Sequence, residues 1–489
     1  MHFLSCRAIL WVGRYDLSDA DKSLDLTRRR LLRWCGLAGM GSVWPMWPGK
    51  SLAGTAVQSE LPGFGRAKSV VFIVASGGQS QLEMWDPKPL APVEVRGDFG
   101  AIRTSVPGVY FGEHMPRLAK MADKFCVVRN MSHEDLDHGS AFYLTMTGRY
   151  HKRRSANPLP APEDLPCHGA ILQRVRPTSQ FVQSALHLNG PAEVPLIIGP
   201  GQFGGFLGKG YDPLTLGNIS QGEVAIPSLE PQPDAPPHRL QTRQQLLSHM
   251  ELGAPVLRGE RHVMDLQTLY DQAFQMLDRP ETRYAFDLSR ESEETRNRYG
   301  RGRAGQACLL ARRLVEAGVP LITVFWSHNN RGQDVDPSNP DMYGWDTHND
   351  IFVSLKDYLL PRYDLGITAL LEDLEQRGLL DETLVVCVGE FGRAPLVALE
   401  KNFAGASPGR KHWSWVYSIM LAGAGVARGH VVGESDPNGA YPAMTPYGPW
   451  DVTATLFHAL GIDPHTHYTD HQGRPYRISD GQVMEAIYG

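Results

Sequence analysis

Acidic, imidazole and cationic side chains follow apolar segments at three places in the second half of the chain. The candidates for a chemical site are Asp346, His348, Glu390, Arg393 and His412. Carboxylate oxygens and imidazole nitrogens bind divalent metal ions such as Zn²⁺ and Mn²⁺. Arg offers a two-pronged donor to phosphate or sulfate. The combination therefore predicts a metal site, an oxyanion site or both.

Each of these candidates also has a plainer interpretation. Asp346 could cap the helix that follows it, leaving His348 in a surface contact. Glu390 and Arg393 could form an ion pair with each other, and His412 would mean little on its own. The nearby Asp350 could join Asp346 and His348 as a ligand. The residues alone leave these alternatives open.

A second concentration of polar groups lies in the first third of the chain. The segment Ser132-His133-Glu134-Asp135-Leu136-Asp137-His138-Gly139-Ser140 places two His, three acidic residues and two hydroxyls in nine positions. A helix is expected to begin just after Asp137 and His138, where free backbone N–H groups would favour an anion beside His138. The alternative is a solvated acidic loop.

Short apolar runs alternate with segments of helical periodicity along the chain. Strands are expected at 69–75, 125–129, 320–326, 384–388 and 417–422. Helices are expected at 115–123, 139–148, 261–277, 303–318, 352–378 and 451–460. This alternation predicts an α/β fold, a doubly wound sheet with helices on both faces. Ligand sites in such sheets lie at strand ends, so the polar groups that follow the strands are expected to converge there.

Size and charge narrow the class of protein. A chain of 489 residues can form one large α/β domain with insertions, or two or three smaller domains. Because 48 Lys and Arg face 53 Asp and Glu, the formal net charge of −5 gives no electrostatic excess for binding nucleic acid. Six Cys without a CxxC pair argue against a zinc ribbon and against a dense disulfide framework.

The amino terminus has the layout of a twin-arginine export signal. Paired Arg residues in the segment 27–33 precede a modest apolar stretch from Trp34 to Trp47 and then small residues around Ala53 to Ala56. The plainer interpretation is a basic helix start. The apolar stretch is too short and too interrupted to span a bilayer, so no stable membrane span is expected. We therefore expect residues 1–56 to be an extension and signal peptide recognised by the twin-arginine export machinery.

The remainder, residues 57–489, is expected to form a single domain. A Pro-rich segment near 220–260 interrupts the alternation of strands and helices, which indicates an insertion or surface loop. Export through the twin-arginine route would place this domain in the periplasm or otherwise outside the cytoplasm.

Several short motifs together resemble a bacterial family of exported proteins of unknown function within the alkaline phosphatase and sulfatase superfamily. The resemblance covers the chain from about Lys68 to its end. The motifs are Gly77-Gly78 through Asp86-Pro87-Lys88-Pro89, Asp137-His138-Gly139-Ser140 through Thr147-Gly148-Arg149, Trp345-Asp346-Thr347-His348, Gly389-Glu390-Phe391-Gly392-Arg393, Lys411-His412-Trp413 and Gly461-Ile462-Asp463-Pro464. The resemblance implies a three-layer α/β/α fold with a mostly parallel sheet of the alkaline phosphatase-like type.

The resemblance also assigns roles to the candidates. It implies a divalent metal (Zn, Mn, Mg or Ca) held by Asp346, His348, Glu390 and His412. It places His138 where phosphatases and sulfatases carry a hydroxyl or thiol nucleophile, and Ser76-Gly77-Gly78 where they carry a metal-binding Asp. Glu390 is followed by Phe391 where an Asp-His pair is typical. These departures imply a reduced site with one metal ion or none.

The resulting hypothesis is an exported metal-dependent hydrolase acting on a sulfate or phosphate ester. The expected catalytic residues are His138, Asp137 and Arg393, with Arg393 holding the anion. The expected partner is an anionic small molecule or a sulfated or phosphorylated glycan. The alternative is a non-catalytic protein of the same fold that binds an anionic glycan or a partner protein.

Overall fold

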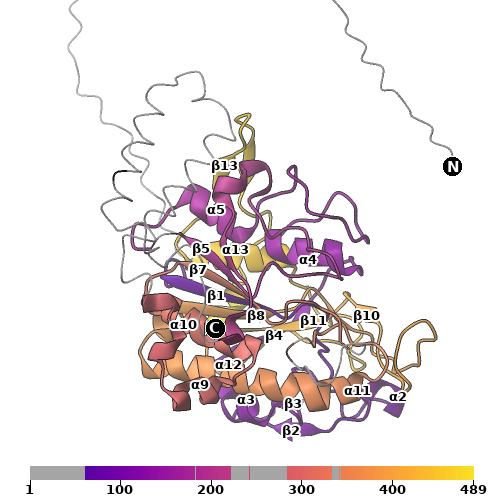
Figure 1. Ribbon diagram of the computed structural model, residues 1–489. Coiled ribbons are helices and arrows are strands. Elements are labelled where there is room, and N and C mark those ends of the chain that lie inside the picture. Colours follow the sequence, from indigo (N-terminus) through magenta and orange to yellow (C-terminus); the bar gives the residue numbers. More distant parts are fainter. Residues whose placement is uncertain (1–60, 182, 222–241, 243–283, 333–340, 342) are drawn as a thin grey trace, which may run out of the picture. The chain divides into compact units, whose positions relative to one another are not determined.

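The apolar runs of the chain pair into one central sheet of eight strands (Figure 1). The computed structural model describes residues 61–181, 183–221, 242, 284–332, 341 and 343–489. The sheet order is β12-β4-β11-β8-β1-β7-β5-β6. The strands are β1 (Ser69–Val74), β4 (Cys126–Met131), β5 (Ala185–Leu188), β6 (Leu214–Leu216), β7 (Leu321–Phe325), β8 (Thr383–Val388), β11 (Tyr417–Ala422) and β12 (His430–Val432). Pairing is parallel except that β11 runs antiparallel to β4 and β8.

Helices cover both faces of this sheet. One layer contains α4 (His138–Thr147), α5 (His168–Val175) and α13 (Pro449–Ala459). The opposite layer contains α3 (Pro116–Lys120), α9 (Glu293–Tyr299), α10 (Arg303–Glu316) and α12 (Leu360–Gln376). The short helix α11 (Ile351–Val353) runs through a π-helical segment, Ser354–Leu359, into α12. The predicted three-layer, mostly parallel α/β/α fold is confirmed.

Smaller elements lie outside the main sheet. They are α2 (Val93–Arg96) and the strand pairs β2 (Ala101–Arg103) with β3 (Tyr110–Gly112), β9 (Gly392–Arg393) with β10 (His412–Trp413), and β13 (His467–Thr469) with β14 (Pro475–Arg477). No helix among the described residues has the length and apolarity needed to cross a bilayer. The predicted signal at 1–56, most of the insertion near 220–260 and the helix expected at 261–277 lie outside the described residues, so these expectations stay predictions.

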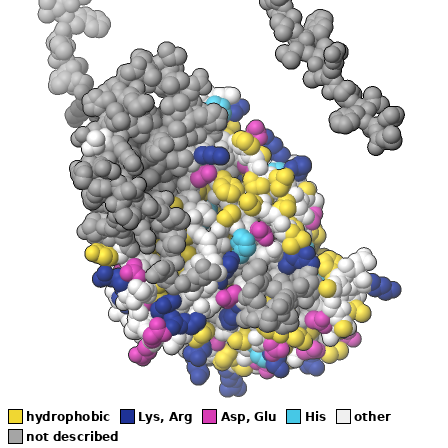
Figure 2. Space-filling view, viewed as in Figure 1, with side chains coloured by type: hydrophobic (Ala, Val, Ile, Leu, Met, Phe, Trp, Pro, Cys, Tyr) yellow, Lys and Arg dark blue, Asp and Glu magenta, His cyan; other side chains and the backbone are white. Residues whose placement is uncertain are grey.

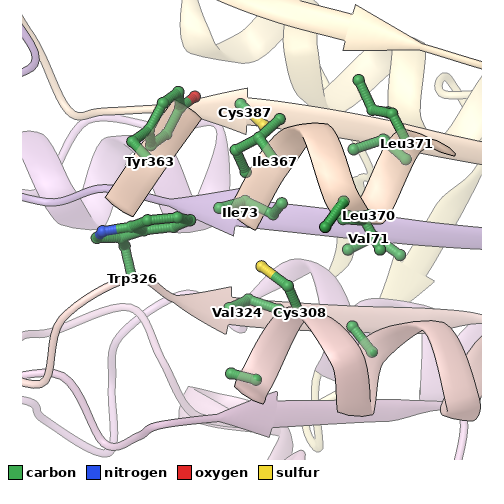
Figure 3. Close-up of a cluster of buried hydrophobic side chains, with 14 of the residues drawn as sticks. Val71, Ile73, Cys308, Val324, Trp326, Tyr363, Ile367, Leu370, Leu371 and Cys387 are labelled. Carbon is green, nitrogen blue, oxygen red and sulfur yellow. The ribbon is translucent and has the colours of Figure 1, made fainter. Parts of the chain in front are cut away.

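Successive side chains of the central strands point to opposite faces of the sheet. Each face therefore packs against its own layer of helices in a separate apolar core. On one face, Val71 and Ile73 of β1 pack with Cys387 of β8 against Ile367 and other side chains of α12 (Figure 3). The opposite face of the same strands packs against α4, α5 and α13. Strands buried on both faces read as continuous apolar runs, which is why the central strands stood out in the sequence.

The central strands end together at the edge where polar residues follow. Val74 of β1 is in register with Phe325 of β7 and with Val388 of β8. Gly77, just beyond β1, has a φ of +124°, and a Cβ atom placed there would lie 2.1 Å from the backbone nitrogen of Asp346. A residue without a side chain is therefore required for the segment that carries Asp346 to cross the end of β1.

Gly77→Ala is expected to lower the free energy of unfolding by about 3 kcal/mol or more, because backbone strain and a clash with the Asp346 segment add together. Gly108→Ala is the matched control, since Gly108 also has a positive φ, +82°, but a Cβ atom placed there would have nothing within 4 Å. The control should lose only about 1–2 kcal/mol. Urea unfolding of both variants measures the difference, and equal losses would contradict the close crossing.

Candidate metal centre

The Asp346 carboxylate is the centre on which the polar groups of the strand ends converge. Its segment, between β7 and α11, is held by backbone hydrogen bonds: Asp346 N donates to Asn330 O at 2.6 Å, and Trp345 N donates to Ser76 O at 3.3 Å. Together with the absence of a side chain at Gly77, these bonds fix where the carboxylate lies. About 15% of the Asp346 side chain remains exposed, which leaves the centre open to solvent.

Three imidazoles direct their Nε2 atoms at one oxygen of this carboxylate. Asp346 Oδ1 lies 3.1 Å from His138 Nε2, 3.0 Å from His348 Nε2 and 3.0 Å from His412 Nε2. The Nε2 atoms of His348 and His412 lie 3.0 Å apart. These His residues come from the start of α4, the loop before α11 and strand β10, so the fold gathers groups that are far apart in sequence. The carboxylate and its three imidazoles are called the Asp346 cluster below.

The other ring nitrogen of each imidazole contacts an oxygen acceptor. His138 Nδ1 lies 2.7 Å from Glu390 Oε1, His348 Nδ1 lies 3.2 Å from Glu400 Oε1, and His412 Nδ1 lies 3.1 Å from the carbonyl oxygen of Leu136. Ionised carboxylates and carbonyl oxygens only accept hydrogen bonds, so a neutral ring can donate from Nδ1 to its outer acceptor or from Nε2 to Asp346. The first of these two tautomers turns the Nε2 lone pair toward Asp346, which is the arrangement of metal-binding His residues.

Electrostatics at the centre favour a positive charge beside Asp346. Burial opposes protonation of His138, but the carboxylates of Asp346 and Glu390 outweigh it and raise the pKa of His138 to about 9. Burial likewise opposes ionisation of Asp346, yet the surrounding imidazoles hold its pKa well below the ordinary value. Burial and the neighbouring His138 lower the pKa of His412. Without a metal ion, the cluster therefore holds an anionic carboxylate and a proton.

Glu390 lies behind His138. Its Oε1 and Oε2 atoms accept hydrogen bonds from Gly77 N at 2.7 and 2.9 Å, and Oε1 also accepts from His138. The side chain is fully buried. The structure thus brings Glu390, a predicted metal ligand, to His138 and to the end of β1, where it orients the imidazole.

Arg393 is also fully buried, and its donors are directed at backbone oxygens. The guanidinium donates to Gly78 O at 3.0 Å and to Trp345 O at 2.8 Å, and it also bonds Gly77 O. It lies 3.3 Å from Asp346 Oδ1. The simple ion pair with Glu390 is not formed among the described residues. These contacts join the end of β1 to the Asp346 segment, so the geometry gives Arg393 a positioning role.

The start of α4 differs from the expectation in one respect. Gly139 N donates to Asn157 Oδ1 at 2.8 Å, and Ser140 N donates to Ala156 O at 3.0 Å. The prediction of free N–H groups for an anion is therefore wrong at these two positions. Asp137 is half-buried and makes no side-chain capping bond to α4. Of the three predicted catalytic residues, His138 joins the Asp346 cluster, Arg393 lies beside it, and the described structure has no hydrogen bond or ion pair between the Asp137 side chain and the cluster.

The hydrogen bonds behind His138 continue into the preceding loop. His133 Nδ1 accepts from Asp135 N at 3.1 Å, so His133 Nε2 carries the proton and donates to Glu390 O at 2.6 Å. Burial lowers the pKa of His133 to about 4, which keeps this ring neutral. Asp135 in turn accepts from the hydroxyl of Ser140 at 2.7 Å. The hydroxyl near the helix start is therefore committed to this loop.

Glu400 was missed in the sequence, although it contacts His348. Asn349 fastens the loop that carries Glu400: its Nδ2 donates to Glu400 O at 2.8 Å, and its Oδ1 accepts from Glu400 N at 2.9 Å. The Phe403 ring stacks on His348 with centroids 3.8 Å apart. Asp350, a possible extra ligand, instead accepts from the backbone of the same loop. An apolar run at 394–399 precedes Glu400 in the sequence, but it forms no strand of the central sheet.

Two acidic residues, Glu83 and Asp86, follow Ser76-Gly77-Gly78, the position where phosphatases and sulfatases carry a metal-binding Asp. Both form ion pairs outside the Asp346 cluster. Glu83 forms a fully buried ion pair with Arg410, with Arg410 Nη2 2.7 Å from Glu83 Oε1. Asp86 lies 3.0 Å from Lys88 Nζ and 3.4 Å from Arg129 Nη1. Both carboxylates are thus neutralised by cations that are not part of the Asp346 cluster.

Arg393→Met is expected to reduce the free energy of unfolding by about 3 kcal/mol or more, because several buried carbonyl oxygens lose their donor. The control, Arg103→Met, alters an exposed Arg of β2 and should change stability by less than about 0.5 kcal/mol. Chemical denaturation followed by circular dichroism provides the measurement. If Arg393 were a free anion clamp, the two variants would be equally stable.

Several solved structures are similar to this chain. Ps i-CgsB is 12% identical with a TM-score of 0.40, covering 88% of this chain and 76% of that protein. PsFucS1 sulfatase from Pseudoalteromonas sp. is 13% identical with a TM-score of 0.37, covering 83% and 68%. A protein in the alkaline phosphatase superfamily from Vibrio parahaemolyticus is 8% identical with a TM-score of 0.37, covering 82% and 68%. At these values the similarities carry no argument about activity.

Comparison with curated proteins found no match. A family model described as "Protein of unknown function (DUF1501)" matches residues 67–488, which is almost the whole span of the predicted resemblance. The expected membership in a family of unknown function is confirmed. The chain that carries the Asp346 cluster therefore belongs to the DUF1501 family of proteins of unknown function.

Proposed function

We propose that this protein is an exported metal-dependent hydrolase of phosphate or sulfate esters, with one divalent ion held by His138, Asp346, His348 and His412. The observation that carries the proposal is the convergence of three Nε2 atoms on Asp346 Oδ1 while each Nδ1 contacts an outer oxygen. Imidazole lone pairs and a carboxylate repel one another unless a cation lies among them, and either a proton on His138 or a divalent ion would supply that cation.

The residues present fit a metal ion by two further tests. His138 Nε2 is buried and, apart from the Asp346 carboxylate, has no polar partner in the described structure, so it is available as a ligand atom. One atom each from His138, Asp346 and His412 lies within 4.8 Å of the others. A donor set of three imidazoles and one carboxylate favours Zn²⁺ or another first-row transition ion over Mg²⁺ or Ca²⁺, which prefer oxygen ligands.

An ion bound here would supply Lewis acidity toward an ester oxygen and toward water. The surrounding residues would set its environment. Glu390, Glu400 and the Leu136 carbonyl hold the imidazoles in the ligating tautomer, and Arg393 fixes the segment that carries Asp346. Because only one ligand is anionic, a divalent ion and its ligands would carry a net positive charge; Glu390 and Glu400 behind the imidazoles and Arg393 beside Asp346 also act on an incoming ester.

The mode of attack follows from what lies at the start of α4. His138 faces Asp346 there, and the Ser140 hydroxyl donates to Asp135 instead of facing the cluster. These positions favour direct attack by water over attack by a side-chain hydroxyl. The same observation also favours the second candidate, a non-catalytic protein that binds an anionic ligand, and turnover decides between the two. Export remains an inference from the Arg pair and apolar stretch of residues 1–56.

Purified protein is expected to retain about one equivalent of a divalent metal per chain, measured by elemental analysis after gel filtration. His412→Ala should abolish retention because it removes a ligand, and Glu390→Gln should weaken binding about 10- to 100-fold because it alters the group behind His138. His430→Ala changes an exposed His of β12 and serves as the control. Wild-type protein without metal, or full retention in His412→Ala, would contradict the proposal.

Hydrolysis is expected for at least one member of a panel of aryl phosphates and aryl sulfates. Activity should disappear on chelation and return when Zn²⁺ or Mn²⁺ is restored, because the ion supplies the Lewis acid. Asp346→Asn, which preserves shape but removes the central charge, should lose activity. Metal retention with no turnover of any ester would reject the hydrolase and leave the ligand-binding alternative.

A further inference from the structure

A run of three cations lies next to the loop that presents His138 to the metal centre. Lys152, Arg153 and Arg154, here called the basic loop, are all exposed. On the face shown in Figure 2, basic and acidic side chains are interspersed. None of the three has a role in the metal centre as described above.

The basic loop is fixed on both sides by buried or backbone contacts. Before it, His151 is buried, and its Nδ1 accepts from Arg153 N at 3.0 Å while its Nε2 lies 3.5 Å from Asp164. After it, Ser155 N donates to Asp135 Oδ1 at 3.1 Å, and Ala156 N donates to Ser140 Oγ at 3.2 Å. A segment held in this way keeps its place relative to its neighbours.

The contacts that follow the basic loop in sequence connect it to the metal centre. Asn157 Oδ1 accepts from Gly139 N, the residue immediately after the ligand His138. Asp135 also belongs to the hydrogen-bond chain that runs through His133 to Glu390. The three cations are therefore held beside the His138 end of α4, where the ring of His138 meets Asp346.

The charges of the basic loop are available to a ligand. In the described part of the chain, Lys152 and Arg153 form no ion pair. Arg154 lies 3.5 Å from Glu134, but both side chains are more than half exposed, at 54% and 65%. An exposed pair of this kind contributes little and is readily exchanged for another anion. The Arg154 guanidinium also lies 3.8 Å from the Tyr150 ring centroid, which holds it in a defined direction.

We infer that the substrate is a polyanion: a sulfated or phosphorylated oligosaccharide whose reacting ester lies at Asp346 and whose neighbouring anionic groups contact Lys152, Arg153 and Arg154. This inference rests on the proposed function and specifies its substrate class. A single small ester would reach only the metal ion, whereas a chain bearing repeated charges would contact both positions. Charge complementarity of this kind strengthens binding and accelerates association in a salt-dependent manner.

The test is a titration of the metal-loaded protein with fluorescein-labelled dextran sulfate, read by anisotropy at several salt concentrations. The triple variant K152Q/R153Q/R154Q should raise Kd at least about tenfold and flatten the dependence of log Kd on log salt, because fewer counterions are released. The control triple R103Q/R117Q/K120Q removes three exposed cations from β2 and α3 and should bind as wild type does. Neutral dextran should not bind.

An unchanged Kd of the basic-loop triple for dextran sulfate, or equal weakening in the control triple, would overturn the inference. Duplex DNA that binds as tightly as dextran sulfate would overturn it too, since that would indicate a general polyanion surface or a nucleic-acid partner. The single charge reversal K152E, checked by circular dichroism, covers the case in which the triple fails to fold. Metal content is measured in the same samples. If dextran sulfate binding contradicts the inference while the metal is retained, only the substrate class is wrong; absence of metal would instead contradict the proposed metal centre.

Discussion

The structure depends on an electrostatic requirement at Asp346. Three imidazole nitrogens lie 3.0–3.1 Å from one oxygen of this carboxylate, and the outer nitrogen of each ring is committed to another acceptor. Acceptor atoms packed together in this way need a cation among them. A proton shared with His138 supplies part of this positive charge. A divalent metal ion would supply it while every ring keeps the tautomer that binds metal through Nε2. The surrounding fold supplies the rigidity that keeps these groups together.

That rigidity comes from backbone contacts at the end of the sheet. Gly77 allows the Asp346 segment to cross β1, Glu390 binds Gly77 N and His138, and Arg393 joins the backbone of both segments. Glu390 and Arg393 position His138 and Asp346, which are proposed ligands, by hydrogen bonds made behind them. The buried charges of Glu390 and Arg393 are tolerated because donors and acceptors surround them, as burial of an ion otherwise costs several kcal/mol. The centre is therefore supported largely by hydrogen bonds from the ends of two adjacent strands.

The sequence predicted the sheet and the residues that gather at its edge better than the direction of each side chain. Asp346, His348 and His412 were named because each lies next to a regular segment and is of a metal-ligand type; the structure brings them together, and their role as ligands stays a prediction. Glu390 was assigned with them, but nothing in the sequence says that its carboxylate turns toward Gly77 N. Arg393 was expected to face an anion, and its burial among carbonyl oxygens follows only from tertiary packing. Glu400 was missed because its loop is placed by Asn349 rather than by a local pattern.

The most direct test of the central claim is X-ray absorption spectroscopy at the metal edge of the Zn²⁺-loaded protein. We predict that the ion is coordinated by nitrogen and oxygen only, at about 2.0–2.1 Å, with longer-range scattering from about three imidazoles. Substitution of His348 by Ala should reduce the imidazole contribution by one ring. Coordination by sulfur, or a spectrum with no imidazole scattering, would contradict a metal centre built around Asp346.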